Sequence, residues 1–373
     1  MRLSLAVTSV LGLSIAQAVA EPALGRIEGV AEVTELASGL AHPWGLAFLP
    51  DGRALVTERP GRLRLVSREG RLSQPLAGVP KVYASGQGGL LDVAVDPAFA
   101  QNNLVYLSYA EAGEGGAGTA VARGRLDGER LSDVAVIFRQ EPKVQGGNHF
   151  GSRLVFGRDG TLFVTMGDRF NHRREAQNLA NHIGKVVRIN TDGSVPADNP
   201  FRDRPGAKPE IWSFGHRNVQ GAALDPATGE LWTAEHGARG GDEINRVLAG
   251  RNYGWPVISY GVDYSGAKIG TGRSAPGMEQ PVFYWDPSIA PSGLAFISGG
   301  RYPAWTGRML VGALRGRLVA SLALSGNAVT KEERVLGKLG QRIRDVRQGP
   351  DGLVYLVTDE DNGRILRLDP IQP

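Results

Sequence analysis

Residues 45–59 read GLAFLPDGRALVTER: a short apolar run, a Pro-Asp-Gly turn, and a second run that ends in charged residues. This pattern predicts a β-hairpin, because Pro-Asp-Gly favours a tight turn and the flanking runs suit strands. Similar hairpin patterns occupy residues 91–110, 153–169, 221–237, 293–314 and 344–360. The hairpin therefore occurs six times, and this repetition decides the fold.

A third apolar run follows four of the hairpins. These runs are GRLRLVS from Gly61, GKVVRIN from Gly184, GRLVASL from Gly316 and GRILRLD from Gly363. The copies begin roughly 45 to 75 residues apart, and helical periodicity is almost absent. We therefore predict an all-β fold, a six-bladed β-propeller of four-stranded antiparallel blades. A β-sandwich also alternates strands, but it gives no reason for one hairpin to recur six times.

The first 20 residues have the features of a signal peptide: an early positive charge at Arg2, a short apolar stretch, and small residues before position 21. We expect cleavage near Ala20, a periplasmic or secreted protein, and one catalytic domain over residues 21–373. A membrane anchor is the alternative. Polar residues interrupt the apolar stretch, however, and it is shorter than the roughly 20 residues that a bilayer requires. No membrane span is expected in the mature protein.

The charge and cysteine content exclude some classes of function. The chain has no cysteine, so cysteine chemistry is excluded and disulfides cannot stabilise the fold. The formal net charge is only +4, and the arginines are scattered, so we expect no nucleic-acid partner. Arginine can grip a planar carboxylate through two parallel hydrogen bonds, so a small anionic ligand is compatible with this composition.

Hairpin geometry predicts a binding site on one face of the propeller, because a hairpin begins and ends on the same face. Polar residues that precede first strands are Gln87, His149, Arg217, Asn218, Arg342 and Arg344; residues at the ends of second strands include Asp168, Arg315 and Asp359. Taken alone, His149 in the loop QGGNHFGSR would be an ordinary loop histidine. Several ionisable groups directed at one axis need a ligand, an ion or one another, so we predict a ligand site there.

Six fragments in chain order carry a specific resemblance: GQGGLLDVAVDP, HFGSRLVFGRDGTLFVTMGD, FGHRNVQGAALDP, GGDEIN, RNYGWP and GQRIRDVRQGPDGLVYLVTDE. From about Gly39 to Leu368 the chain resembles the soluble aldose sugar dehydrogenases, relatives of the soluble quinoprotein glucose dehydrogenases, which use pyrroloquinoline quinone (PQQ) and calcium. The resemblance implies a periplasmic oxidoreductase that converts the C1 hydroxyl of an aldose sugar to a lactone by hydride transfer to PQQ. An unidentified acceptor would then take the electrons from a monomeric or homodimeric enzyme.

The resemblance also assigns roles to individual residues. It implies that His149 is the general base, that Asp168 orients the imidazole, and that Arg217 stabilises negative charge on the quinone oxygen. The implied cofactor-binding residues are Gln87, Arg217, Asn218, Tyr264, Ala313, Leu314, Arg315, Arg342 and Arg344. The carbonyls of Gly237 and Ala238 would face a catalytic calcium, and Glu243 and Tyr253 would belong to a structural calcium. His216 is expected to be structural.

Three positions depart from the family pattern. Asn148 replaces an aspartate before the base, Ala238 replaces a proline, and Arg315 replaces a lysine. These changes bear on the pKa of the base, the shape of the metal loop and the contact with the cofactor.

Two other functions stay open. One is a calcium-dependent lactonase or esterase, because six-bladed propellers also host hydrolases. The other is a non-catalytic sugar-binding propeller.

Overall fold

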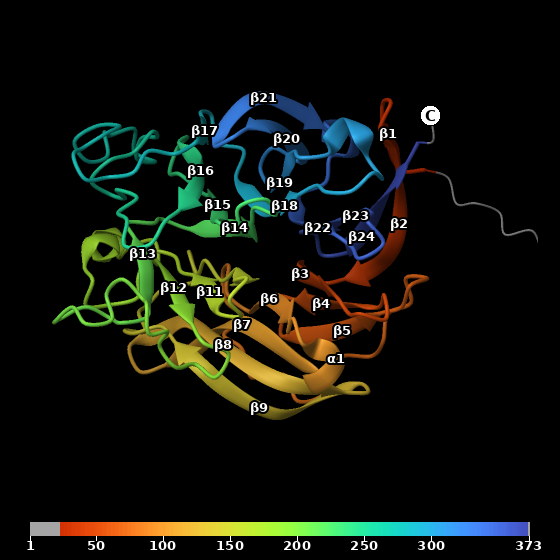
Figure 1. The fold of residues 1–373 in the computed structure, drawn as a ribbon, viewed down its shortest axis with the longest axis horizontal. Helices are drawn as coiled ribbons and strands as arrows, with labels where there is room; N and C mark the ends of the chain where they lie inside the picture. The colour runs from red at the N-terminus through yellow and green to blue at the C-terminus, as the bar shows by residue number, and fades with distance from the viewer. Residues whose placement is uncertain (1–22, 372–373) are drawn as a thin grey trace, which may run out of the picture.

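The computed structural model describes residues 23–371. Its strands form six antiparallel sheets arranged around a central axis (Figure 1). The predicted six-bladed propeller is therefore confirmed. The predicted signal peptide, residues 1–20, lies outside the described residues. Within residues 23–371, no helix is long and apolar enough to cross a membrane.

The strands of each sheet follow one another from the axis outward. The strands nearest the axis are β3 (Pro43–Phe48), β6 (Leu90–Val95), β10 (Leu154–Phe156), β14 (Val219–Leu224), β18 (Pro291–Phe296) and β22 (Ile343–Gln348). The second strands are β4 (Ala54–Glu58), β7 (Leu104–Gly113), β11 (Leu162–Thr165), β15 (Leu231–Glu235), β19 (Met309–Ala313) and β23 (Val354–Thr358). The third strands are β5 (Arg62–Val66), β8 (Gly116–Asp127), β12 (Lys185–Ile189), β16 (Asp242–Val247), β20 (Leu318–Ser325) and β24 (Gly363–Pro370). Four outer strands are β9 (Arg130–Arg139), β13 (Ile211–Phe214), β17 (Phe283–Trp285) and β21 (Ala328–Val335). The described helical segments are α1 (Phe99–Asn102), η1 (Arg173–Gln177), η2 (Pro303–Trp305) and η3 (Gly337–Leu339).

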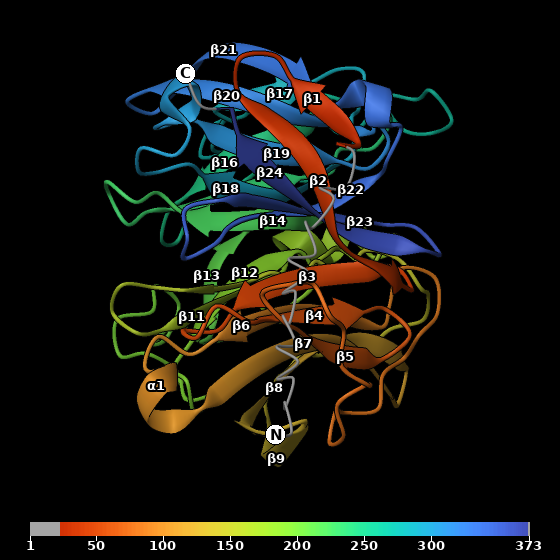
Figure 2. The ribbon, with the colours of Figure 1, turned by 90° about the vertical axis from the view of Figure 1, so that its right-hand side faces the viewer.

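The first and last sheets depart from four strands because they close the ring. Strand β2 (Ala31–Leu40) pairs with β24, and β1 (Gly25–Ile27) pairs with β2, so the last sheet has five strands. Figures 1 and 2 show the red β2 beside the blue β24. The first sheet has three strands, β3 to β5. Residues 73–76 take the fourth place there without forming a regular strand, held to β5 by backbone hydrogen bonds of 2.9 and 2.8 Å.

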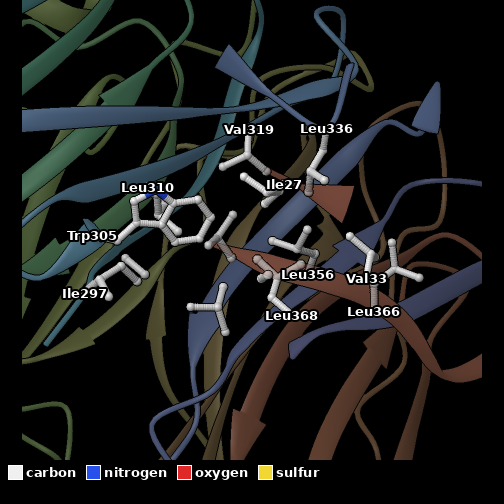
Figure 3. Close-up of a cluster of buried hydrophobic side chains, with 14 of the residues drawn as sticks. Ile27, Val33, Ile297, Trp305, Leu310, Val319, Leu336, Leu356, Leu366 and Leu368 are labelled. Atoms are coloured by element: carbon white, nitrogen blue, oxygen red, sulfur yellow. The ribbon is translucent and has the colours of Figure 1, made fainter. Parts of the chain in front are cut away.

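Apolar clusters between neighbouring sheets hold the ring together. One cluster joins the fifth and sixth sheets, and it includes Trp305 and Leu310 together with Leu356 (Figure 3). Ile27 of β1 and Val33 of β2 are buried in the same cluster. The strands that close the ring are therefore held by burial of apolar side chains as well as by backbone pairing.

Hydroxyl side chains on the second strands explain the recurrent Thr and Ser of the hairpins. In five sheets the register of the first strand against the second shifts near the start of the first strand. In three sheets a hydroxyl on the second strand accepts a hydrogen bond from a backbone N–H at that end: Gly45 to Thr57, Asp92 to Ser108, and Arg153 to Thr165, each at 2.9 Å. These contacts satisfy buried amides at the start of the first strands, where in the first two sheets regular pairing is interrupted.

A buried network of charges lies between the first strands. Arg153 contacts Asp92 at 2.9 Å and Asp345 at 3.1 Å. Arg347 contacts the same two carboxylates, at 3.2 and 2.9 Å. Two positive and two negative charges thus compensate one another, which a buried ionic cluster requires.

This network leaves no room for a larger residue at Gly45, the first residue of the repeated hairpin. A Cβ on Gly45 would lie 2.6 Å from Asp92 Oδ1 and 3.0 Å from its Cα. Because Arg153 and Arg347 hold Asp92 in place, we expect Gly45→Ala to lower the free energy of unfolding by about 1–3 kcal/mol, measured by urea titration. Gly300→Ala has open space around the new methyl group and is the control. Equal losses in the two variants would contradict the steric explanation.

Candidate functional site

The loop that carries His149 has an unusual backbone. Gly146, His149, Gly151 and Ser152 all have positive φ, at 107°, 54°, 64° and 88°. Glycine adopts this region freely, whereas a histidine there must be held by its surroundings. The side chain of Gln87, in the loop before β6, accepts a hydrogen bond from the His149 N–H at 2.9 Å. The glycines of QGGNHFGSR thus let the chain present His149 just before β10 begins.

His149 and Asp168 form a buried pair. The imidazole Nδ1 lies 2.6 Å from Asp168 Oδ1, and the two residues are 5% and 1% exposed. The same carboxylate oxygen accepts a hydrogen bond from the Phe170 N–H at 2.8 Å, and Oδ2 accepts one from the Trp255 indole at 2.8 Å. Three donors therefore fix the orientation of the carboxylate, which in turn fixes the imidazole.

The electrostatics of this pair keep the imidazole neutral and the carboxylate ionised. Burial lowers the pKa of His149 below its ordinary value of 6.5, although the hydrogen bond to Asp168 acts in the opposite direction. Burial alone would raise the pKa of Asp168, but the hydrogen bond from His149 and the charge of Arg217 lower it below its usual range. At neutral pH the pair is therefore an imidazole with Nδ1–H bound to a carboxylate, which leaves Nε2 as a proton acceptor.

Arg217 stands at the start of β14, beside this pair. Its guanidinium donates to the carbonyl oxygens of His236, at 3.1 Å, and Gly237, and to the Tyr264 hydroxyl at 3.3 Å. It also lies 5.3 Å from the centre of the Trp255 ring. The guanidinium is thereby held between backbone carbonyls and two aromatic side chains.

One cavity, which we call the axial cavity, is rich in arginine. Its lining residues are Trp44, Arg59, Gln87, Leu91, Phe150, Gly151, Gln220, His236, Ala290, Leu314, Arg315, Arg342, Arg344 and Asp359. Asp359 contacts Arg344 at 2.8 Å and Arg342 at 3.3 Å. Burial alone would raise the pKa of Asp359, but the charges of Arg344, Arg59 and Arg342 hold it well below its usual range. Four arginines against one carboxylate give the axial cavity an excess of positive charge.

A second hollow, the side cleft, opens next to the axial cavity. Its lining residues are Asp168, Phe170, Asn171, Arg173, Arg217, Ala238, Trp255, Asp263 and Tyr264. Phe170 and Tyr264 are 41% and 59% exposed, and their rings stack with centroids 6.3 Å apart. Gln87 lines the axial cavity and Asp168 lines the side cleft, and both hydrogen-bond His149. His149 therefore stands between a cationic cavity and a cleft with aromatic walls.

Comparison with known proteins shows the family of the chain. The family model for glucose/sorbosone dehydrogenases matches residues 40–367. The chain belongs to that family. It is therefore an oxidoreductase of the aldose sugar dehydrogenase class, built on a propeller.

Individual members of the glucose/sorbosone dehydrogenase family cover most of the chain. Aldose sugar dehydrogenase YliI of Escherichia coli (strain K12) is 49% identical over 354 residues, covering 93% of this chain and 95% of that protein. Quinoprotein glucose dehydrogenase B of Acinetobacter calcoaceticus is 27% identical over 423 residues, covering 89% and 86%. The PQQ-bound structure of aldose sugar dehydrogenase from Streptomyces coelicolor is 31% identical with a TM-score of 0.76, covering 91% of this chain and 98% of that one.

Most of the site residues implied by the family resemblance line one of three cavities in the structure. Gln87, Leu314, Arg315, Arg342 and Arg344 line the axial cavity, and Asp168, Arg217, Ala238 and Tyr264 line the side cleft. Gly237, Glu243 and Tyr253 line a smaller cavity that Arg217 and Glu235 also touch. Asn218 is buried between these regions, and its side-chain oxygen accepts from the Gly151 N–H at 3.2 Å. Ala313 is fully buried in β19 and lines neither the axial cavity nor the side cleft.

Several residues of this site were not assigned from the sequence. Arg59 lines the axial cavity and directly follows the end of β4, so the hairpin geometry that selected Arg315 points to it as well. Gln220 receives a hydrogen bond from Arg344 at 2.9 Å. Trp255 binds Asp168 from 87 positions along the chain, and no local pattern signals that contact.

Ser213, His216 and Glu235, between the third and fourth sheets, form an arrangement that resembles a hydrolase triad. The Ser213 hydroxyl lies 2.9 Å from His216 Nε2, and His216 Nδ1 lies 3.0 Å from Glu235 Oε2. Their exposed fractions are 0%, 0% and 4%, and His216 stacks on Tyr253. A substrate cannot reach this serine, so the arrangement is structural, as expected for His216, and it gives no support to the hydrolase alternative.

Proposed function

We propose that the chain oxidises the C1 hydroxyl of aldose sugars to the lactone by hydride transfer to PQQ, with His149 as the general base. The observation that carries this proposal is the His149–Asp168 pair, which stands between the arginine-rich axial cavity and the aromatic side cleft. Membership of the family supports a sugar as the substrate, and the PQQ-bound relative supports the cofactor. The signal-peptide pattern of residues 1–20 supports a periplasmic place of action.

The axial cavity fits a planar cofactor that carries several carboxylates. Arg59, Arg315, Arg342 and Arg344 line it, and Asp359 offsets one of their charges. The Nε of Arg344 is buried, and within residues 23–371 it has no hydrogen-bond partner. Arginine is suited to paired hydrogen bonds with carboxylates, so these residues would hold PQQ. When bound there, PQQ supplies the acceptor for the hydride from the sugar C1.

The protein's own contribution to the reaction is proton transfer and orientation. His149 donates Nδ1–H to Asp168, so Nε2 is the nitrogen that takes the proton from the C1 hydroxyl. The resulting imidazolium lies against an ionised carboxylate, which stabilises its charge. Phe170 and Tyr264 give the sugar an apolar face to pack against, next to the base. The guanidinium of Arg217 would stabilise negative charge that develops at the cofactor.

We include calcium in the proposal because the predicted ligand atoms are of the kind that bind it. Among residues 23–371, no three His, Cys, Asp or Glu side chains gather into a metal cluster. The predicted ligands are instead backbone carbonyls and Glu243, hard oxygen donors of the kind that calcium prefers. Glu243 pairs directly with Glu235 across β15 and β16, and burial together with the Glu235 charge raises the pKa of Glu243 to about 8. A divalent cation would compensate the negative charge of these two neighbouring carboxyl groups.

The contacts of Tyr253 indicate which of its atoms could bind a cation. Its hydroxyl donates to the Arg246 carbonyl at 2.5 Å and accepts from the Leu248 N–H at 2.8 Å. Tyr253 would therefore bind a structural cation through its backbone carbonyl. The Gly237 carbonyl accepts a hydrogen bond from Arg217, so a catalytic cation bound to Gly237 would share that oxygen with the guanidinium or displace it.

The test is reconstitution of the purified apoprotein. Dye-linked oxidation of glucose and other aldoses would be measured with PQQ and calcium together, with each alone, and with neither, while the product is identified as the lactone. We expect oxidation only when PQQ is present, and a loss of activity on chelation that added calcium reverses. Hydrolysis of sugar lactones by the protein without PQQ, and no oxidation with it, would replace the proposal with the hydrolase alternative.

The pKa of the base gives a pH prediction. His149 must be neutral to accept a proton, so kcat/KM should fall as the pH drops through its pKa. Burial, aided by the charges of Arg217 and Arg169, lowers that pKa against the pull of Asp168, so the acid limb should lie below pH 6.5. In Asp168→Asn the opposing charge is lost, and the limb should move to still lower pH. A limb that moves to higher pH in this variant would contradict the assignment of His149.

A further inference from the structure

Arg169, the residue after Asp168, is a buried cation that the reaction described above does not use. Its side chain is 1% exposed, and burial lowers its pKa to about 10. Among residues 23–371, no carboxylate lies within ion-pair distance of it, and its Nε has no hydrogen-bond partner. Burying a guanidinium in this way costs stability, so its remaining contacts should explain its presence.

Those contacts are with the loop that presents the base. The guanidinium donates to the carbonyl oxygen of Gly146 at 2.6 Å and to that of Asn148. Its Cζ lies 3.5 Å from the centre of the Phe150 ring, on the other side of His149. A single side chain therefore binds the residues immediately before and after the histidine.

Gln87 also holds the backbone of residues 147–149. The Gly147 carbonyl accepts from the Gln87 N–H at 2.7 Å, and the His149 N–H donates to the Gln87 side chain. Because His149 and Ser152 have positive φ, a region that only glycine adopts freely, the loop needs contacts that hold this conformation. Arg169 and Gln87 bind the backbone of residues 146–149. The backbone of Phe150 and Gly151 is bound by Thr119, Asn218 and Gln220.

We propose that Arg169 is a positioning residue that holds the His149 loop in its catalytic conformation by joining the Gly146 and Asn148 carbonyls over the Phe150 ring. This inference rests on the proposed role of His149 as the base. It explains why the base sits on a glycine-rich loop: the exposed carbonyls of that loop are the acceptors for the guanidinium. Arg169 also follows Asp168 directly, so one turn of chain orients both the imidazole and its loop.

The test compares Arg169→Met and Arg169→Lys with a matched control. Methionine keeps much of the apolar stem but supplies no donor, and lysine keeps the charge but cannot reach two carbonyls with a planar fork. Arg188→Met is the control. Arg188, on β12, is also a buried arginine stacked on an aromatic ring, 4.6 Å from the centre of Trp212, and it does not contact the loop.

Two measurements are made. Hydrogen exchange of the peptide covering residues 145–152, in the cofactor-free protein, should be about tenfold faster or more in Arg169→Met and intermediate in Arg169→Lys. In the reconstituted enzyme, kcat should fall about 10- to 100-fold while the sugar KM changes by about twofold or less, because a displaced base weakens the chemical step more than binding. Arg188→Met should lower the melting temperature without either change.

Unchanged loop exchange in a folded Arg169→Met or Arg169→Lys protein would overturn the inference, as would a kcat loss matched by Arg188→Met. Failure of the proposed function is a separate result. It would show as an inactive wild type under saturating cofactor. The exchange experiment measures the loop's stability in the cofactor-free protein and needs no catalysis.

The pH profile adds a third readout, since Asp168, Arg169, Arg217 and His236 are the charged or titratable groups around His149. Removing the positive charge in Arg169→Met should move the acid limb to higher pH, whereas Arg169→Lys should leave it in place.

Discussion

His149→Gln should lower kcat by about two to four orders of magnitude while PQQ is still bound, because general base catalysis typically contributes a factor of that size. Glutamine has a similar length and can donate to Asp168 through its amide, so the buried carboxylate keeps a partner. It cannot accept the proton of the C1 hydroxyl. The measurement is single-turnover reduction of the bound cofactor by glucose, followed by absorbance, which separates the chemical step from cofactor release.

A second histidine–carboxylate pair provides the control for this variant. His182 is 2% exposed and its Nε2 lies 3.3 Å from Glu210, in a part of the molecule that lines neither the axial cavity nor the side cleft. His182→Gln should cost stability and leave single-turnover rates within about twofold. If His149→Gln retained the wild-type rate with the cofactor bound, another group would be the base.

The fold was predictable because each blade repeats the same local chemistry. Turn residues such as Pro50-Asp51-Gly52 and Pro350-Asp351-Gly352 occur between apolar runs, and the structure places a hairpin at each. The strand pairing that closes the ring was not predicted from the sequence. Strand β2 pairs with β24, more than 300 positions away, and nothing in residues 31–40 resembles the repeated hairpin. Pairing at that separation is decided by the geometry of the complete ring.

Hairpin geometry predicts only those site residues that lie at the ends of the hairpins. His149 and Asp168 belong to the two ends of one hairpin, so their approach follows from the sheet that joins them. Trp255 lies on a loop between β16 and β17 and reaches Asp168 from outside that hairpin. Arg169 was not predicted from the sequence, for a different reason. Its neighbours are backbone carbonyls, which every residue carries, so no residue pattern marks them as its partners.

Arg344→Gln should weaken PQQ binding by about 10- to 100-fold, which is the loss expected when one charge-assisted hydrogen bond worth about 1.5–3 kcal/mol is removed. Arg344 is buried at the axial cavity, where it donates to Gln220 at 2.9 Å and to Asp359 at 2.8 Å. In the variant, Asp359 keeps Arg342 and His42 as partners, at 3.3 and 3.0 Å, so the carboxylate is not left alone.

Arg347→Gln is the matched control for this variant, since Arg347 contacts Asp345 and Asp92 and does not line the axial cavity. It should lower stability while the Kd for PQQ, measured by absorbance titration of the apoprotein, changes by about twofold or less. Added salt should raise the wild-type Kd more than that of Arg344→Gln, because fewer charges then attract the cofactor. If both variants bound PQQ as wild type does, the arginines of the axial cavity would serve the propeller rather than an anionic cofactor. If both weakened binding equally, the loss would come from distortion of the first strands.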